Sequence, residues 1–166
     1  LRRNFTDDIR LVSRNPRKVD DADQLVPADL MDAEATDAAV AGSEIVYLTV
    51  GLPADSGLWE QRFPTMMANA IAACANHGSK LVFFDNTYMY PRTSAPQTED
   101  TAFEPVGRKA GVRARIASML LTEMDAGTID AVICRAPEFY GPGKTQSVTN
   151  SAVFDRIKRG KQPLVP

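Results

Sequence analysis

The chain alternates short apolar runs with longer amphipathic segments. The apolar runs predict β-strands at residues 9–13, 25–30, 45–50, 81–84 and 129–134. Apolar residues at helical spacing predict helices at residues 32–41, 59–76, 112–124 and 151–159, with Gly42 and Gly78 as stop signals for the first two. Strands that alternate with helices of this length predict an α/β fold with a parallel sheet and right-handed crossovers.

The run at residues 45–50 is almost continuously apolar, which is typical of a strand buried on both faces of a parallel sheet. Residues 91–105 are rich in Pro, Thr and acidic residues. A segment of this length without a periodic pattern is too long for a simple connector, and we therefore expect it to be functional.

Composition narrows the function classes. The chain has 166 residues, 44% of them hydrophobic and 24% charged, with a net charge of −2. These values indicate a globular domain with a real core, and they argue against a nucleic-acid or anionic-membrane binder, which needs a basic excess. No apolar run approaches the roughly 20 residues that a bilayer span requires. We expect no membrane partner, and a cytoplasmic location because no signal peptide is visible.

The cysteine and histidine counts exclude further classes of site. Cys74 and Cys134 lie in a predicted helix and a predicted strand, where they are expected to be small core residues. The single histidine, His77, ends a predicted helix. A metal site, a disulfide framework or a histidine-based triad is therefore not expected.

Several short motifs occur in a fixed order. They are Ser-Arg-Asn-Pro at residues 13–16, Asp29-Leu30, the apolar strand at 45–50, Asp-Asn-Thr-Tyr-Met-Tyr at 85–90, Lys109, and Glu-Phe-Tyr-Gly-Pro-Gly at 138–143. In this order the chain resembles the extended short-chain dehydrogenase/reductases, the NAD-dependent epimerase/dehydratase group, and more narrowly an atypical subgroup. The resemblance implies a doubly wound, Rossmann-like domain at residues 1–145. Residues 146–166 would then begin a C-terminal substrate region.

The resemblance also implies a missing element. In this fold the first strand is central, and its glycine-rich turn holds the cofactor pyrophosphate at a helix N-terminus. Neither is visible here, and the strand order places the absent strand between residues 9–13 and 45–50. We therefore expect these residues to be part of a longer protein and to fold poorly alone, because two half-sheets would lack a hydrogen-bonding neighbour.

Ser13 and Arg14 follow the first strand where Rossmann sites often carry an acidic residue. An acid there binds the ribose 2′-hydroxyl of NAD, whereas an arginine accommodates the 2′-phosphate of NADP. The pair therefore favours NADP as cofactor, with NAD as the alternative. Arg14 could equally be one more solvated cation in a basic stretch with Arg10, Arg17 and Lys18.

Four further residues match cofactor-lining positions of the family. The resemblance implies that Asp29 and Leu30 line the adenine pocket, and an Asp at this point is equally suited to capping a helix. It also implies that the backbone of Val50 and Gly51 runs beneath the cofactor. Gly51 permits such an approach, although a glycine before Leu-Pro is also ordinary turn chemistry.

The catalytic positions depart from the family pattern. The family uses Ser or Thr, Tyr and Lys, with the Tyr four residues before the Lys as acid and base. Lys109 matches the lysine, but Pro105 stands at the tyrosine position and Asn86 at the hydroxyl position. Tyr88 or Tyr90 is therefore a candidate substitute acid. The alternative for Lys109 is a surface lysine in a basic cluster.

Residues after the last predicted strand complete the expected site. The resemblance implies that Ala136 and Pro137 pack near the nicotinamide and that Tyr140 begins the substrate region. A bare Pro-Gly turn is the alternative for the latter. Residues 91–105 resemble the variable loop over the substrate mouth, and a solvated acidic loop is equally consistent with them.

Together these features predict an NADP-dependent epimerase, dehydratase or reductase that acts on a sugar nucleotide or another small carbonyl compound. The rival is a non-catalytic NADP sensor of the same superfamily, which Pro105 favours. A self-contained interaction domain would require the chain to fold alone, and the expected missing strand argues against it. The substrate itself is not predicted. The two long helices at residues 59–76 and 112–124 allow a homodimer, as is common in the family.

Overall fold

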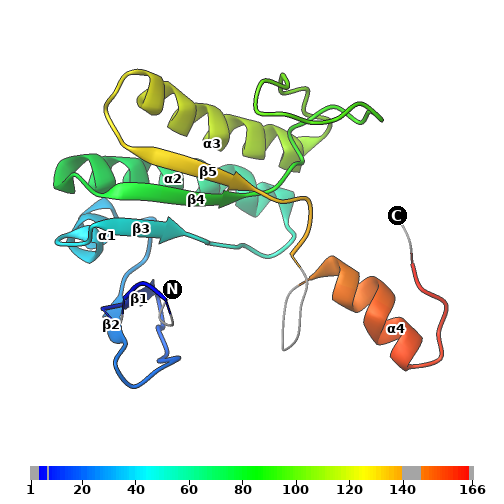
Figure 1. Cartoon of the computed structure of the whole chain (residues 1–166), viewed down its shortest axis with the longest axis horizontal. Coiled ribbons are helices and arrows are strands. Elements are labelled where there is room, and N and C mark those ends of the chain that lie inside the picture. The colour runs from blue at the N-terminus through cyan, green and yellow to red at the C-terminus, as the bar shows by residue number, and fades with distance from the viewer. Residues whose placement is uncertain (1–3, 7, 140–146, 165–166) are drawn as a thin grey trace.

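The computed structural model describes residues 4–6, 8–139 and 147–164, and it shows an α/β chain with two parallel sheets (Figure 1). One sheet pairs β1 (Arg10–Ser13) with β2 (Gln24–Pro27). The other has the order β3-β4-β5, formed by Ile45–Leu48, Lys80–Asp85 and Ala131–Arg135. The helices are α1 (Ala33–Val40), α2 (Ser56–His77), α3 (Arg108–Asp125), and the consecutive η1 (Asn150–Phe154) and α4 (Asp155–Lys158). The predicted parallel α/β alternation is confirmed.

Strands β1 and β3 lie in separate sheets. The order is β1-β2 in one sheet and β3-β4-β5 in the other. Strands β2 and β3 end at Pro27 and Leu48, three and two residues earlier than the sequence pattern predicts.

Local signals account for the helix boundaries. The side chains of Asp32 and Asp55 accept hydrogen bonds from the amides of Ala35 and Leu58, which satisfies free donors at the first turns of α1 and α2. Helix α2 ends at Gly78, whose φ of 64° lies in the left-handed region that favours glycine. The predicted final helix at residues 151–159 is observed as η1 followed by α4.

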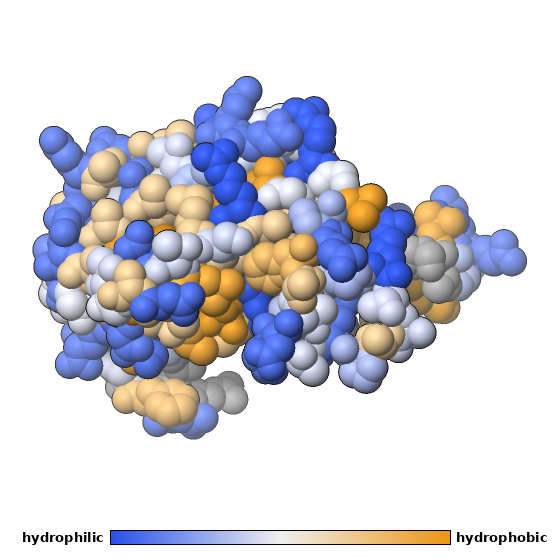
Figure 2. Space-filling model, turned by 90° about the horizontal axis from the view of Figure 1, so that it is seen from above, coloured by the Kyte–Doolittle hydropathy of each residue, from blue (hydrophilic) through white to orange (hydrophobic). Residues whose placement is uncertain are grey.

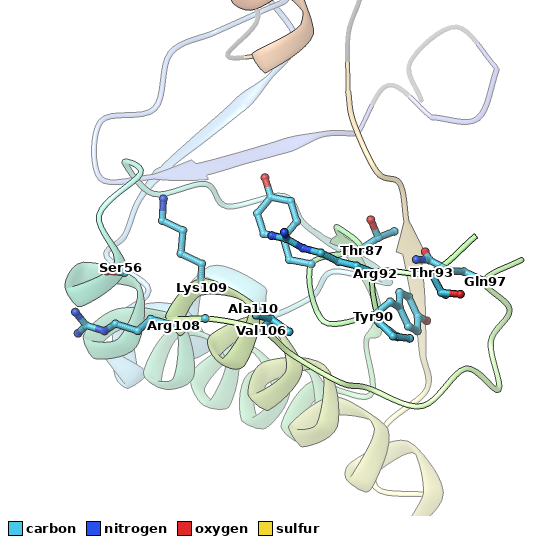
Figure 3. A pocket seen from close by; sticks show the side chains of 13 residues that line it. Ser56, Thr87, Tyr90, Arg92, Thr93, Gln97, Val106, Arg108, Lys109 and Ala110 are labelled. Carbon is cyan, nitrogen blue, oxygen red and sulfur yellow. The ribbon is translucent and has the colours of Figure 1, made fainter. Parts of the chain in front are cut away.

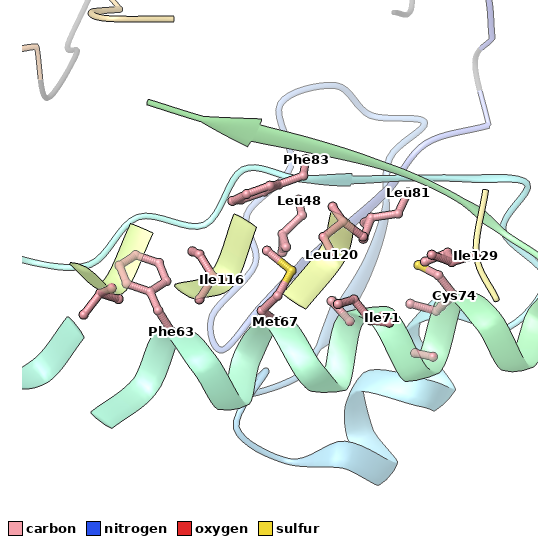
Figure 4. Packing of buried hydrophobic residues seen from close by; sticks show 14 residues of the cluster. Leu48, Phe63, Met67, Ile71, Cys74, Leu81, Phe83, Ile116, Leu120 and Ile129 are labelled. Carbon is pink, nitrogen blue, oxygen red and sulfur yellow. The ribbon is translucent and has the colours of Figure 1, made fainter. Parts of the chain in front are cut away.

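The core lies between the β3-β4-β5 sheet and the helices α2 and α3 (Figure 4). Leu48, Leu81 and Phe83 point from their strands toward this layer, and Met67, Ile71, Ile116 and Leu120 meet them from the helices. Large apolar side chains at these positions explain the packing, because removing their surface from water is the main favourable term in folding.

Only one face of this sheet is covered by the described residues, which corrects the expectation for residues 45–50. Ile45 and Tyr47 of β3 are 47% and 39% exposed, and Phe84 and Val132 are exposed on the neighbouring strands. The strands therefore alternate between a buried and an exposed face. An apolar run by itself does not reveal this, because the exposed positions are also hydrophobic. From above, hydrophobic residues also gather near the middle of the surface, with hydrophilic ones around them (Figure 2).

The cysteines are placed as expected in α2 and β5, with Cys74 buried and Cys134 half-buried. Burial raises the pKa of the Cys74 thiol to about 11, because the thiolate is poorly solvated in an apolar layer. The thiol therefore stays protonated at neutral pH and behaves as a small hydrophobic group. No helix in the described residues is long and apolar enough to cross a membrane.

Candidate active site

A pocket of about 700 Å³ opens where β4 ends and α3 begins (Figure 3). The carboxyl ends of parallel strands are the usual place for ligands in open α/β sheets. Ser56 and Lys109 lie at one end of the pocket, and Tyr90, Thr93 and Gln97 lie at the other. The full lining consists of Ser56, Thr87, Tyr88, Tyr90, Pro91, Arg92, Thr93, Gln97, Val106, Gly107, Arg108, Lys109 and Ala110.

The loop at residues 91–105 contributes to this pocket through its first part. Pro91, Arg92, Thr93 and Gln97 line it, whereas the acidic residues that the sequence singled out, Glu99, Asp100 and Glu104, are exposed and not among the lining residues. The pocket wall therefore combines hydroxyl, amide and cationic groups with the apolar side chains of Pro91, Val106 and Ala110. One of the cations is already paired, because Arg108 Nε donates to Glu60 Oε1 at 2.8 Å. This hydrogen bond holds the pKa of the Glu60 carboxyl below its usual value.

Lys109 enters the pocket from the first turn of α3. The helix begins after Gly107, whose φ of 89° brings the chain into the helix from a conformation that favours glycine. The Lys109 Nζ lies 5.2 Å from the centre of the Trp59 ring, within the range of a cation–π contact. The structure therefore places Lys109 at the pocket and half-buried.

Tyr88 and Tyr90 differ in their surroundings although only one residue separates them. Tyr88 is 47% exposed, and its ring lies nearly parallel to Trp59, with centroids 6.5 Å apart. Tyr90 is only 7% exposed, and its ring packs edge-on against Phe103. The phenol oxygen of Tyr90 accepts a hydrogen bond from Arg135 Nη1 at 2.9 Å. Both tyrosines line the pocket, but only the Tyr88 side chain is largely open to it.

Asn86 is half-buried and engaged with the local backbone. Its side-chain oxygen accepts a hydrogen bond from the backbone amide of Tyr88 at 3.1 Å. The backbone amide of Asn86 donates to Asp85 Oδ1 at 2.8 Å. The side-chain NH₂ group remains as a donor. Asn86 is not among the residues that line the pocket, although its neighbours Thr87 and Tyr88 are.

Asp85 organises the end of β4. Its carboxylate is fully buried and accepts a hydrogen bond from Arg113 Nε at 2.8 Å. Arg135 Nε lies 3.5 Å from the other carboxylate oxygen. One carboxylate therefore faces two guanidinium groups, and the three residues together connect β4, α3 and β5.

The predicted cofactor residues lie at the ends of β1, β2 and β3. Ser13 is the last residue of β1, and Arg14 follows it with an exposed side chain. Asp29 accepts a hydrogen bond from the Met31 amide, so its carboxylate stabilises a turn, while Asp32 caps α1. The Leu30 carbonyl accepts a hydrogen bond from Asn69 Nδ2.

Val50 and Gly51 follow β3. Val50 packs against the core, and a side chain built at Gly51 would meet no atom of the described chain within 4 Å. The packing of the described residues therefore gives no reason for a glycine there.

Beyond β5, Ala136 donates its amide to the Asp85 carbonyl at 3.2 Å, and Pro137 is exposed. Tyr140 and the Gly-Pro-Gly segment after it lie outside the described residues. Glu138 accepts hydrogen bonds from the amides of Phe139 and Thr149, which joins the end of β5 to the segment before η1.

A family model described as "NAD dependent epimerase/dehydratase family" matches residues 4–166. The chain belongs to this family. The match confirms the resemblance drawn from the motifs. No curated protein matches the sequence of this family member.

Solved structures share the fold of this epimerase/dehydratase family member. UDP-glucuronic acid 4-epimerase from Bacillus cereus, in complex with NAD, has a TM-score of 0.78 at 12% identity, over 95% of this chain and 57% of that one. DesIV, a dTDP-glucose 4,6-dehydratase from Streptomyces venezuelae with NAD and TYD bound, has a TM-score of 0.77 at 14% identity, over 95% and 54%. Uronate dehydrogenase from Agrobacterium tumefaciens has a TM-score of 0.63 at 18% identity, over 75% and 49%. The chain spans about half the length of these enzymes, and the likeness shows a Rossmann-like fold.

Lys109, which the resemblance matches to the family lysine, lines the pocket. Pro105, four residues earlier, has no side-chain group that can donate or accept a proton. In the described residues no group of three or more His, Cys, Asp or Glu side chains could hold a metal ion.

Sequence reasoning missed two features of the site. The sequence pattern marks Trp59 only as one apolar position of the helix predicted at residues 59–76, and it gives Arg113 no role of its own. Arg113 is in fact buried. A signal for it was present: Arg113 lies three positions before Ile116 and seven before Leu120, so the helical period places it on their apolar face.

Proposed function

We propose that the protein is an NADP(H)-dependent enzyme of the epimerase, dehydratase or reductase type, acting on a sugar nucleotide or another small carbonyl compound. The observation that carries this proposal is the convergence of Lys109 and Tyr88 on one pocket, where both contact Trp59. The two groups come from residues 21 positions apart in the sequence. They supply a cation and a phenol beside the carboxyl ends of the strands.

A dinucleotide would lie along one side of the site, at the ends of β1, β2 and β3. Gly51 leaves open space at the end of β3, where a cofactor could approach the backbone closely. Arg14, exposed after β1, is the residue that would hold a 2′-phosphate, with Ser13 beside it. Asp29 and Leu30 would lie at the adenine, and Ala136 and Pro137 at the nicotinamide. When bound, the nicotinamide supplies the hydride acceptor or donor.

The chain's own groups would then bind and orient. Lys109 would donate hydrogen bonds to the nicotinamide ribose, since an ammonium group carries three donors. The Tyr88 phenol would hold a proton at the oxygen of a substrate carbonyl, which is the role that Pro105 cannot fill. Asn86 does not line the pocket, and its side chain would support Tyr88 through the hydrogen bond that its oxygen accepts from the Tyr88 amide. Tyr140 would contact the rest of the substrate.

The experiment that tests this is a calorimetric titration of NADPH and NADH on the whole protein, with Arg14→Ala beside it. We expect NADPH affinity to fall at least tenfold in the variant, about 1.4 kcal/mol, with NADH affinity unchanged. Arg17→Ala is the matched control, because Arg17 is another exposed cation of the same segment, and it should bind as the wild type does. If neither cofactor binds the wild-type protein, the proposal is refuted.

One observation favours a second candidate, a non-catalytic NADP sensor. Pro105 removes the family's proton-transfer residue, and the Tyr90 phenol is tied to Arg135. A sensor would bind NADPH with the same dependence on Arg14 but would turn over no substrate in a screen of sugar nucleotides and small carbonyl compounds.

A cytoplasmic location and a homodimer through α2 and α3 are also part of the proposal.

A further inference from the structure

The Lys109 ammonium group lies on an aromatic surface. Its Nζ is 5.2 Å from the centroid of the Trp59 ring, and no salt bridge joins Lys109 to an acidic side chain in the described residues. The kind of partner decides how many N–H donors of Lys109 stay free for a ligand. A carboxylate partner would occupy N–H donors of the lysine, whereas an aromatic face attracts the cation through its ring electrons. Held this way, the ammonium group keeps donors for another ligand.

Trp59 is itself firmly held. Its indole N–H donates to the Pro53 carbonyl at 2.7 Å, which fixes the polar end of the ring. Its other side meets Phe63 edge-on, with centroids 5.1 Å apart and planes at 89°. Phe63 belongs to the buried core. The indole therefore joins the pocket residues Lys109 and Tyr88 to the core residue Phe63.

Tyr88 uses the same indole. Its ring is inclined by only 7° to the Trp59 ring, with centroids 6.5 Å apart, an arrangement within the usual range for aromatic pairs. Tyr88 and Lys109 both line the pocket. In the family pattern the phenol and the lysine are held together by one turn of a shared helix; here Pro105 interrupts that relation, and the two groups come from different elements.

We propose that Trp59 is a positioning residue that holds Lys109 and Tyr88 together at the pocket and so replaces the shared helical turn. This inference rests on the proposed function, because it assigns Lys109 to the cofactor. It predicts that Trp59 acts on cofactor binding only through Lys109. A residue that served the fold alone would show no such dependence.

A double-mutant cycle tests this relation on the whole protein, with NADPH affinity measured by calorimetry. Trp59→Leu should weaken NADPH binding about threefold to tenfold, in keeping with the strength of a cation–π contact. Trp59→Phe keeps an aromatic face, so the binding free energy that it loses should be less than half of that lost by Trp59→Leu. In a Lys109→Met background, Trp59→Leu should change the affinity by less than twofold. Thermal unfolding of each variant reports on the fold separately.

The outcomes separate the two proposals. Absence of NADPH binding by the wild-type protein would refute the proposed function, and this inference with it. Normal binding that Lys109→Met weakens but Trp59→Leu leaves unchanged would refute the inference alone. Equal losses from Trp59→Leu with and without Lys109 would also refute it. If Trp59→Leu does not fold, the cycle is completed with Trp59→Phe, whose smaller loss must likewise vanish in the Lys109→Met background.

Discussion

Arg113 donates through Nε to the buried Oδ1 atom of Asp85 at 2.8 Å, and this contact joins α3 to the end of β4. The guanidinium group lies over the rings of Phe63 and Phe83, 5.2 Å from each centroid. Flat, weakly hydrated guanidinium groups suit such stacked positions. The pair fixes the point at which the chain leaves β4 and begins the segment that carries Tyr88 and Tyr90.

Replacing Asp85 should destabilise the protein strongly. In Asp85→Asn the carboxylate that faces Arg113 and Arg135 is lost, and within the described residues neither guanidinium group has another acidic partner. We expect the free energy of unfolding to fall by about 3–5 kcal/mol, the usual effect of breaking a buried ion pair. Chemical denaturation measures it.

Asp130→Asn is the control for this prediction. Asp130 pairs with Lys80 at 3.1 Å, and the side chains of Lys80 and Asp130 are 43% and 71% exposed. Surface pairs contribute little, so the change should stay below about 1 kcal/mol. Similar effects of the two substitutions would contradict the assigned importance of the buried pair.

Tyr88→Phe and Tyr90→Phe should have opposite consequences. Tyr88 is exposed at the pocket, so removing its hydroxyl should leave stability unchanged while cofactor-dependent turnover falls about 10²- to 10⁴-fold, the range for loss of a general acid. Tyr90 is buried and accepts a hydrogen bond from Arg135. Its loss should lower the free energy of unfolding by about 1–3 kcal/mol, because a buried donor is left unpaired.

Denaturation curves and turnover measured on the same two variants decide between these roles. A variant Tyr88→Phe that turns over substrate at the wild-type rate would remove Tyr88 from the mechanism. If Tyr90→Phe instead abolished turnover without loss of stability, the role of acid would pass to Tyr90.

The contact between α1 and the end of α2 should make stability depend on pH in the acidic range. The Asp37 carboxylate accepts a hydrogen bond from Asn76 Nδ2 at 3.0 Å and lies 3.0 Å from His77 Nε2. The hydrogen bond from Asn76, followed by that from His77, lowers the pKa of Asp37 below its usual 3.8. Because the pKa in the folded state is below that in the unfolded state, the stabilisation is complete above the usual value and is lost as the pH falls through the lowered one.

Asp37→Asn should therefore be less stable than the wild type near neutral pH, and the difference should shrink as the pH falls below about 4. Urea denaturation at a series of pH values measures this. Glu99→Gln, a change of an exposed carboxylate in the loop, is the control and should follow the wild type throughout. A difference between Asp37→Asn and the wild type that stays constant down to the acid limit would refute the assigned contribution of the charge.

The sequence alone determined the elements and the family of this protein. Strand and helix formation depends on local features such as apolar spacing, the capping carboxylates Asp32 and Asp55, and the left-handed glycine at position 78, all of which are legible in a short window. The order of the motifs added the family and the pocket residues Lys109, Tyr88 and Tyr90. It could not show which of the two tyrosines is exposed at the pocket, because both are the same residue type in one short segment and their burial depends on the fold.

Only the tertiary structure decided how these residues are used. Trp59 meets Lys109, and Asp85 meets Arg113, across 50 and 28 positions of the chain, and no local pattern encodes such pairs. The exposed face of β3 was likewise invisible, because burial depends on which helices cover a strand and not on the strand's own residues. Packing decides these points, since the contacts form only once separate elements are brought together and water is excluded between them.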